Sequence, residues 1–405
     1  MFFRTQSSRL EALASTSSTP LYLVGFAESV ATPEVCFSLR ATGARVACFF
    51  RSNKKGKFAR MRSVEYYPVI APETDFNHTT HDIEALVSHL RPDLTAPCDD
   101  AALFVLSRLD ESKTRSLAPT GKACDFALDK WVQLGFASAS GFAVMKTQLV
   151  TSKTDIAQFP CRPAVLKPRA ALDIRGNGLD KGPSFIIEDT EIPGQALEEL
   201  AKRPYLIQEY KAGIGEGFFG IAKEGKIFAS FGHRRLRMMN PAGSGASACI
   251  SREPEEVERR AAEALIKMIK WRGPFMVELL RDHSGKAWFM EFNGRFWGSL
   301  ALARRCGLDM PRLAAELACG KSVTIPSKIE PGFARHLGRD LVHLMFVMRG
   351  RHRGAHSLAW PGRFASARKI ICPHSLKSFY NYNESEPLFF VKDAVVTVLN
   401  AIRGK

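Results

Sequence analysis

Short apolar runs alternate with amphipathic stretches over the first part of the chain. Residues 21–25 and 45–50 are apolar runs typical of buried strands, and a predicted helix over 29–42 lies between them and ends at Gly43. A further helix is predicted around 82–90 and another strand near Leu94. This β-α-β order predicts a small parallel α/β domain over residues 21–115. No G-x-G-x-x-G follows the first strand, so the pattern does not favour a dinucleotide-binding domain.

The pattern changes after residue 115 to strands that follow one another closely. A helix is predicted over 129–141, strands over 164–167, 184–187 and 205–210, and a hairpin over 218–231 with its turn at Glu224-Gly225. Residues 254–271 form an amphipathic helix whose predicted apolar stripe is Val257, Ala261, Leu265, Met268 and Ile269. A second hairpin joins 275–280 to 287–293 through a turn at 282–285.

The second hairpin carries candidate metal ligands. Side chains alternate between the faces of a strand, so Glu291, Asn293 and Arg295 share one face. A four-residue turn would place Glu278 opposite Phe289 and diagonal to Glu291 on that face. Two carboxylates and an amide are hard oxygen ligands that suit Mg²⁺ together with phosphate oxygens. The alternative is a solvent-exposed sheet face on which Glu291 and Arg295 form a simple ion pair.

Two other segments indicate nucleotide binding. Gln208-Glu209-Tyr210 ends an apolar strand, and Glu216 follows within a glycine-rich stretch that suits a hinge around a flat heterocycle. Residues 215–220 match G-x-G-x-x-G by letter, but they precede a hairpin and not a helix, which argues against a dinucleotide site. Lys130 and Lys167 are lysines in strand or loop contexts, and a Gly-rich, charged loop over 169–182 could fold over phosphates or be an ordinary surface loop.

Taken together, these segments resemble the ATP-grasp superfamily. Residues 290–299 (MEFNGRFWGS) resemble its Glu-x-Asn-x-Arg metal strand, Val-Leu-Lys167-Pro its first phosphate-binding lysine strand, and Gln-Glu209-Tyr with Glu216 its adenine hinge and ribose carboxylate. The resemblance covers residues 21–327 and is to carbamoyl-phosphate-synthase-like and carboxylate–amine ligase members. It implies an α/β N-terminal domain over 21–115, an ATP-grasp domain over 116–330 and a lid subdomain over about 145–208.

The resemblance also implies a role for each matching residue. ATP would be bound by Lys130 and Lys167 at the phosphates, Glu209 and Tyr210 at adenine, Glu216 at ribose, and Gly176 and Gly178 in the lid loop. Mg²⁺, commonly two ions and replaceable by Mn²⁺, would be held by Glu278, Glu291 and Asn293. The catalytic arginines would be Arg295 at the transferred phosphate, with Arg235 and Arg237 at the substrate or triphosphate.

The implied function is an ATP- and Mg-dependent ligase that activates a carboxylate as an acylphosphate and joins it to an amine. Two alternatives remain open. One is a bicarbonate-activating carboxylase or carbamoyl-phosphate-type enzyme. The other is a non-enzymatic binder of anionic membrane surfaces or nucleic acid on a degenerate ATP-grasp scaffold. The intact set of carboxylates favours the enzyme.

Composition and charge bear on partners and location. The chain has 405 residues, 57 Lys and Arg against 41 Asp and Glu, and a net charge of +16. Residues 331–380 hold nine of these basic residues and a single acid, Asp340. This segment is therefore a candidate for peripheral contact with an anionic membrane. Nucleic acid is not favoured as a partner. Nine cysteines without a C-x-x-C motif indicate a reducing, cytoplasmic location. Residues 1–20 are expected to be a flexible leader, and a homodimer is plausible for this superfamily.

Overall fold

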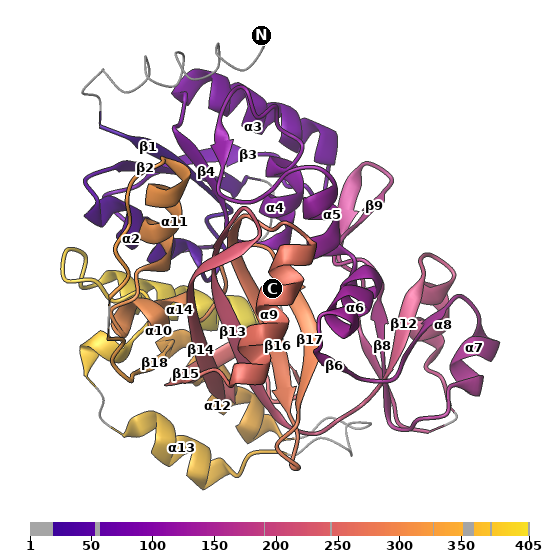
Figure 1. The fold of residues 1–405 in the computed structure, drawn as a ribbon. Coiled ribbons are helices and arrows are strands. Elements are labelled where there is room, and N and C mark those ends of the chain that lie inside the picture. Colours follow the sequence, from indigo (N-terminus) through magenta and orange to yellow (C-terminus); the bar gives the residue numbers. More distant parts are fainter. Residues whose placement is uncertain are drawn as a thin grey trace.

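The computed structural model describes residues 19–52, 57–189, 191–243, 245–326, 328–350, 360–372 and 375–403. Figure 1 shows a parallel-sheet domain above a large central sheet, with a small sheet to one side and the C-terminal helices to the other. Most of the expected leader and the basic run Arg351-His352-Arg353 lie outside the described residues.

The N-terminal domain is the predicted parallel α/β unit. Its five strands lie in the order β3-β2-β1-β4-β5, and all their pairings are parallel. Its elements are β1 (Leu21–Gly25), α2 (Thr32–Ala41), β2 (Arg45–Arg51), β3 (Glu65–Val69), α3 (Phe76–Leu90), β4 (Leu94–Pro97), α4 (Asp100–Leu106) and β5 (Arg115–Ser116). The fold class expected from the sequence is therefore confirmed here. The sheet also contains two edge strands, β3 and β5, that were not predicted.

A small antiparallel sheet forms the lateral unit in Figure 1, with strand order β11-β8-β12-β7. It has its own hydrophobic core, centred on Val150, Leu166 and Ile207. Its elements are β7 (Thr147–Val150), α7 (Lys153–Gln158), β8 (Ala164–Pro168), β11 (Phe185–Ile187), α8 (Gly194–Leu200) and β12 (Tyr205–Glu209). The expected loop over 169–182 is instead a hairpin of β9 (Asp173–Arg175) and β10 (Gly178–Asp180).

The central sheet has seven strands in the order β18-β15-β14-β13-β16-β17-β6. Its elements and flanking helices are α5 (Lys122–Leu128), α6 (Lys130–Ala139), β6 (Ala143–Val144), β13 (Ile214–Lys223), β14 (Lys226–Met238), β15 (Ala246–Arg252), α9 (Glu256–Met268), β16 (Gly273–Arg281), β17 (Ala287–Asn293), α10 (Leu300–Arg305), α11 (Met310–Ala318) and β18 (Phe333–Arg335). Both predicted hairpins are present, and Glu224 and Gly225 form the first turn with positive φ of 51° and 74°.

Helix α9 covers one face of this sheet, but its buried stripe is rotated from the predicted one. Val257 and Met268 are exposed, whereas Ala262 and Ile266 are buried. The polar Glu258 occupies the inner position because it pairs with two arginines beneath the helix. A buried stripe predicted from apolar residues alone could not include Glu258.

The register of the second hairpin also differs from the prediction. Arg281 pairs with Ala287, and an irregularity between Glu278 and Leu279 then places Glu278 directly opposite Glu291. The partner of Glu278 moves by two residues: the turn adds one, because Arg281 faces Ala287 and not Lys286, and the extra residue Met290 at the bulge adds the other. The two carboxylates therefore share a face, as expected, but as direct neighbours.

The C-terminal segment completes the central unit. Strand β18 pairs with β15 at the sheet edge, and α12 (Leu337–Arg349) packs against β15 and α14 (Phe389–Ile402). The remaining elements are α13 (Arg363–Ile371) and the short helix η1 (Leu376–Ser378). None of the described helices is long and apolar enough to cross a bilayer.

Candidate active site

The site lies on the face of the central sheet opposite α9. Strand pairing places Glu291, Glu278, Gly217 and His233 side by side in one row across four strands. Paired residues in a sheet point to the same face, so the two carboxylates and the imidazole project together. This row forms the floor of the site.

Two lysines from outside the central sheet face these carboxylates. Lys130, at the start of α6, places its Nζ 3.6 Å from Glu291 Oε1. Lys167, on β8 of the small sheet, donates from Nζ to Gln208 Oε1 at 2.9 Å. Burial lowers the pKa of Lys167 to about 8, with Lys130 adding to this and with Glu291 and Glu278 opposing it. The lysines and carboxylates of the predicted site are thus brought together.

The lowered pKa of Lys167 predicts how nucleotide affinity depends on pH. Phosphates favour the protonated lysine, so binding above pH 8 requires proton uptake, and affinity should fall by up to about tenfold per pH unit. Calorimetry with a non-hydrolysable Mg·ATP analogue from pH 7.5 to 9.5 measures this, because the phosphates stay ionised throughout. The variant Lys167→Arg should flatten the profile. An equally steep profile in that variant would contradict the assignment.

Asn293 and Arg295 extend the site beyond β17. Asn293 Nδ2 lies 3.4 Å from Glu278 Oε1, and its Oδ1 accepts from Arg295 Nη2 at 2.7 Å. Arg295 Nε also donates to Asp100 Oδ1 at 2.9 Å. Burial raises the pKa of Asp100, but Arg295 together with Lys181 and Lys130 outweighs burial, so the pKa lies below its ordinary value.

Asp100 is a site residue that sequence reasoning missed. It is the first residue of α4 and follows the carboxyl end of β4, the usual place for ligand contacts in a parallel sheet. That position was the available signal, since Cys98-Asp99-Asp100 directly follows the predicted strand near Leu94.

Arg235 reaches the site across β13. Its Nη2 lies 2.6 Å from Glu278 Oε2, two strands away. A Cβ on Gly215 would lie 2.8 Å from Arg235 Cδ, and one on Gly217 would lie 2.9 Å from His233 Nε2. The glycines therefore make room for these side chains. The heterocycle hinge expected at this segment stays a prediction.

The close approach at Gly215 makes a specific prediction. Gly215→Ala would displace Arg235 from Glu278, and turnover should fall about 10- to 100-fold while the fold persists. Steady-state kinetics with circular dichroism check this. Gly194→Ala is the matched control, because its new Cβ meets no atom within 4 Å. A Gly215→Ala enzyme with unchanged turnover would show that the Arg235 side chain does not need the space left by Gly215.

The donor set fits a magnesium ion that also binds phosphate. Glu278 and Glu291 supply adjacent carboxylates, and Mg²⁺ is usually bound by one or two carboxylates plus phosphate oxygens. No cluster of three or more His, Cys, Asp or Glu side chains suited to a metal occurs in the described part of the chain. Phosphate and water oxygens would therefore complete the coordination of the ion. Asn293 could be a further ligand if its Oδ1 turned away from Arg295.

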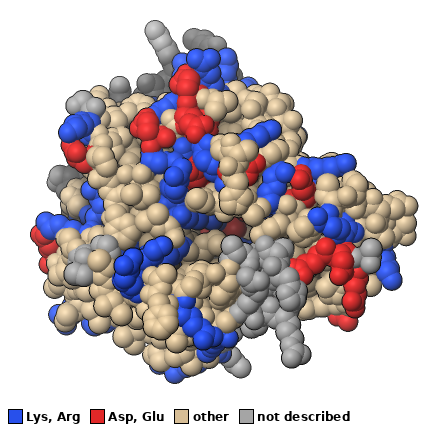
Figure 2. Space-filling model, turned by 90° about the horizontal axis from the view of Figure 1, so that it is seen from below, with Lys and Arg blue, Asp and Glu red and all other residues tan. Residues whose placement is uncertain are grey.

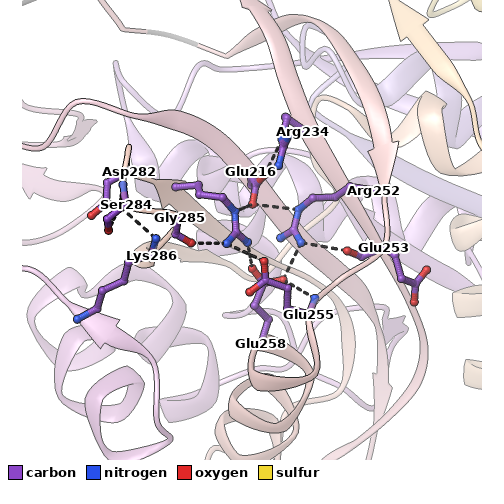
Figure 3. A network of polar contacts seen from close by, with 11 residues as sticks. Glu216, Arg234, Arg252, Glu253, Glu255, Glu258, Asp282, Ser284, Gly285 and Lys286 are labelled. Carbon is purple, nitrogen blue, oxygen red and sulfur yellow. Dashed lines mark hydrogen bonds and ion pairs between the residues drawn. The ribbon is translucent and has the colours of Figure 1, made fainter.

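Glu216 is not placed to bind ribose. It is fully buried on the α9 side, where Arg234 and Arg281 lie 2.8 Å and Arg252 3.1 Å from its carboxylate oxygens. Figure 3 shows this network, which continues to Glu258 on α9. Strand alternation explains the error, because residue 216 faces away from Gly215 and Gly217, which lie on the site face.

Arg237 is also removed from the predicted catalytic set. Its Nε and Nη2 donate to the buried Asp340 of α12 at 3.0 and 2.9 Å, and Arg335 pairs with the same carboxylate. Irregular pairing of β14 with β15 on both sides of Arg237 breaks the strand alternation. The side chain thus ties β14 to the C-terminal helix.

Gly176 and Gly178 do not lie in a free phosphate-binding loop. Gly176, with φ 56°, is in the turn between β9 and β10, and a Cβ on Gly178 would lie 2.2 Å from the Glu73 carbonyl oxygen. Leu179 N also donates to Pro72 O at 2.7 Å. The hairpin is packed against the N-terminal domain, which excludes Gly178 from contact with a nucleotide in this conformation.

Glu209 and Tyr210 lie where β12 leaves the small sheet for the central sheet. Glu209 Oε1 pairs with Lys211 Nζ at 2.6 Å, and Tyr210 N donates to Pro163 O at 3.1 Å. The Tyr210 amide N–H therefore already has an acceptor, and an adenine base bound at this connection would need hydrogen bonds from other backbone groups. Adenine binding by Glu209 stays a prediction.

Comparison with known proteins identifies the fold. No family model and no curated protein matches the chain. Solved structures do match: the chain is similar to an ADP complex of N5-carboxyaminoimidazole ribonucleotide synthetase, with a TM-score of 0.59 and 11% identity over 87% of this chain and 97% of that one. The chain therefore shares the fold of this solved ADP-bound synthetase. More particularly, this chain has the ATP-grasp fold, which confirms the resemblance seen in the sequence.

Two further structures support the same conclusion. An L-amino acid ligase from Bacillus licheniformis has a TM-score of 0.58 at 14% identity and covers 78% of this chain and 76% of its own. A biotin carboxylase from Campylobacter jejuni, in a β,γ-ATP complex, has a TM-score of 0.58 at 14% identity and covers 78% of this chain and 74% of its own. At these identities the likeness shows the fold.

Proposed function

We propose that the protein is an ATP- and Mg²⁺-dependent ligase that activates a carboxylate as an acylphosphate and joins it to an amine. The observation that supports this most directly is the convergence of Glu278 and Glu291 with Lys130 and Lys167 on one sheet face. A set of carboxylates, lysines and arginines suits phosphoryl transfer, where positioning and charge neutralisation supply most of the catalysis. The similarity to a ligase and to ATP-bound enzymes agrees with it.

Each residue of the site has a proposed role that follows from its position. Glu278 and Glu291 would hold Mg²⁺, which neutralises phosphate charge when bound, and Lys130 and Lys167 would bind phosphate oxygens. Arg295 projects from the loop after β17 and would stabilise charge on the transferring phosphoryl group. Arg235 and Asp100 orient Glu278 and Arg295 through direct ion pairs.

The proposed reaction balances in two steps. A carboxylate oxygen of the substrate attacks the γ-phosphorus of ATP, and the bond to the β–γ bridging oxygen breaks to release ADP. The amine nitrogen then attacks the acyl carbon, phosphate leaves with the electron pair of the carbon–oxygen bond, and the amine loses a proton. The product is an amide.

A substrate panel tests the proposal. Carboxylates with and without amino acids as amine donors are assayed for ADP and phosphate release, and products are identified by mass spectrometry. Amide formation with stoichiometric ADP supports the ligase. ADP release driven by bicarbonate alone would instead favour the carboxylase or carbamoyl-phosphate alternative, and no substrate-dependent ADP release would contradict both.

One surface favours peripheral contact with an anionic membrane as a second role. Phe364 and Ile371 on α13 are 94% and 76% exposed, and the helix also carries Arg363, Arg368 and Lys369. Helix α13 lies at the lower edge of Figure 1, and Figure 2 shows that face of the molecule, on which basic side chains lie together with acidic ones. Apolar residues flanked by basic ones suit an anionic interface.

Vesicle sedimentation tests this surface. Wild type should sediment with phosphatidylserine vesicles, and a Phe364→Ser/Ile371→Ser variant should bind about tenfold more weakly, since two large apolar side chains are lost. Ile174→Ser on β9, also exposed, is the matched control. Equal binding by the double variant would refute the role. Point variants are needed because deleting residues 331–405 would remove β18 and α12 from the core.

A further inference from the structure

Helix α14 carries an exposed apolar stripe. Its N-cap residue Leu388, which has helical backbone angles, is 66% exposed, and the other members are Val391, Val395, Leu399 and Ile402, each between 40% and 59% exposed. At 3.6 residues per turn, these five side chains fall within about 80° of arc on one face of the helix. No other helix in the described ranges exposes more than two large apolar side chains. The stripe is therefore a candidate contact surface.

The opposite side of α14 is anchored to the rest of the chain. Phe389 is buried, and its ring meets that of Phe37 on α2 edge-on with the centroids 5.7 Å apart. Asp393 Oδ2 lies 2.9 Å from Nε2 of His336, the N-cap residue of α12. These contacts fix the rotation of the helix about its own axis. The stripe is thus held facing outward and cannot turn in to bury itself.

The spacing of the stripe is symmetric about Val395. Leu388 and Ile402 lie seven residues on either side of it, and Val391 and Leu399 lie four residues on either side. An antiparallel second copy, related by a two-fold axis at Val395, would place Val395 against Val395. The same axis would place Leu388 against Ile402, and Val391 against Leu399. Symmetric dimers need a self-complementary surface of this kind, and the mean step of about 3.5 residues is the repeat of paired helices.

The charges on α14 also suit an antiparallel pair. Glu384 and Glu386 precede the helix, and Arg403 is its C-cap residue. In an antiparallel pair the arginine of one copy lies nearest the acids of the other, whereas a parallel pair would bring like charges together. Lys392 flanks the stripe, and the axis at residue 395 sets it opposite Val398 and not opposite another lysine. Charge therefore favours the same arrangement as the apolar spacing.

We propose that α14 is a homodimer interface in which the stripes of two copies pack antiparallel about a two-fold axis at Val395. A specific interface buries at least about 1,000 Å² in total, and ten half-exposed apolar side chains with their neighbours supply an area of that order. Each copy carries a net charge of +16, so the copies repel one another and the dimer is reversible. A bilayer could also cover apolar side chains, but it does not need the symmetric spacing.

Sedimentation equilibrium of the full chain tests the interface. Wild type should form a reversible dimer whose dissociation constant falls between about 0.05 and about 0.5 M NaCl, because salt screens the repulsion between copies. Val395→Asp should raise the dissociation constant at least 100-fold, because it sets two like charges against each other at the axis. Val257→Asp on α9 is the matched control, since Val257 is also exposed, and it should dimerise as wild type. Circular dichroism establishes that both variants fold.

Cysteine cross-linking tests the register of the two helices. The background is Cys372→Ser, which removes the one fully exposed cysteine of the chain. With copper phenanthroline as oxidant, Val395→Cys should give a covalent dimer, because residue 395 faces its own copy. Val391→Cys and Leu399→Cys should each stay monomeric alone, since like positions lie about 12 Å apart along the helices, beyond the reach of a disulfide. A mixture of these two variants should cross-link.

The following results would overturn the interface. They are a wild type that stays monomeric at every concentration and salt, a dimer that Val395→Asp leaves unchanged, a dimer that weakens as salt rises, or cross-linking of Val391→Cys alone as efficient as that of Val395→Cys. If wild type is monomeric and Val395→Asp binds phosphatidylserine vesicles more weakly, the stripe is a membrane surface instead. The variant Phe364→Ser/Ile371→Ser on α13 should dimerise as wild type, which separates this interface from the membrane role proposed above.

Discussion

Replacing Glu291 with Gln is expected to lower turnover about 10²- to 10³-fold or more while leaving the fold intact. The change removes the charge of a proposed metal ligand next to Glu278, which is also the partner of Lys130 Nζ. Charge stabilisation at a transferring group is worth several kcal/mol of barrier, and glutamine cannot replace it. Initial rates of ADP release over a Mg²⁺ titration measure the effect, and the apparent Mg²⁺ requirement should rise.

The control for this variant is Glu330→Gln, an exposed acid outside the site whose turnover should match wild type. Circular dichroism and thermal unfolding establish that both variants fold. A Glu291→Gln enzyme with near-normal rates and an unchanged Mg²⁺ dependence would show that the metal does not depend on this carboxylate.

The second large effect concerns stability. Glu216→Gln is expected to reduce the free energy of unfolding by about 3–5 kcal/mol, because removing one partner of a buried ionic network leaves the others uncompensated. Arg234, Arg252 and Arg281 would lose their shared carboxylate. Denaturant unfolding measures the loss, and nucleotide affinity of the folded variant should change little.

Glu263→Gln supplies the comparison, since Glu263 lies on α9 but is exposed, and its substitution should change stability by less than about 0.5 kcal/mol. If Glu216→Gln were as stable as wild type but bound ATP weakly, the ribose role expected from the sequence would be restored.

The parts of the site that follow from local pattern were predictable. Alternation along residues 287–293 placed Glu291 and Asn293 on one face. The predicted turn at 282–285 put Glu278 on the same face, where the bulge in β17 in fact keeps it. The bulge that makes the two carboxylates direct neighbours has no sequence signature, because Met290 resembles any other apolar strand residue. The register was therefore wrong although the shared face was right.

The errors arise where distant segments meet. The role of Glu216 depends on pairing between β13 and β16, which no local turn determines. Arg237 forms an ion pair with Asp340, 103 residues later, and Arg295 forms one with Asp100, 195 residues earlier. Such contacts depend on how three units pack together, and hydrophobic periodicity carries no information about that packing.

The position of β18 has a consequence for synthesis of the chain. The strand that covers the β15 edge leaves the ribosome some 80 residues after its partner. Until then the nascent chain exposes an unpaired edge, which is the feature most prone to aggregate between neighbouring chains. A chain terminated before β18 would therefore keep the β15 edge exposed and be prone to aggregate.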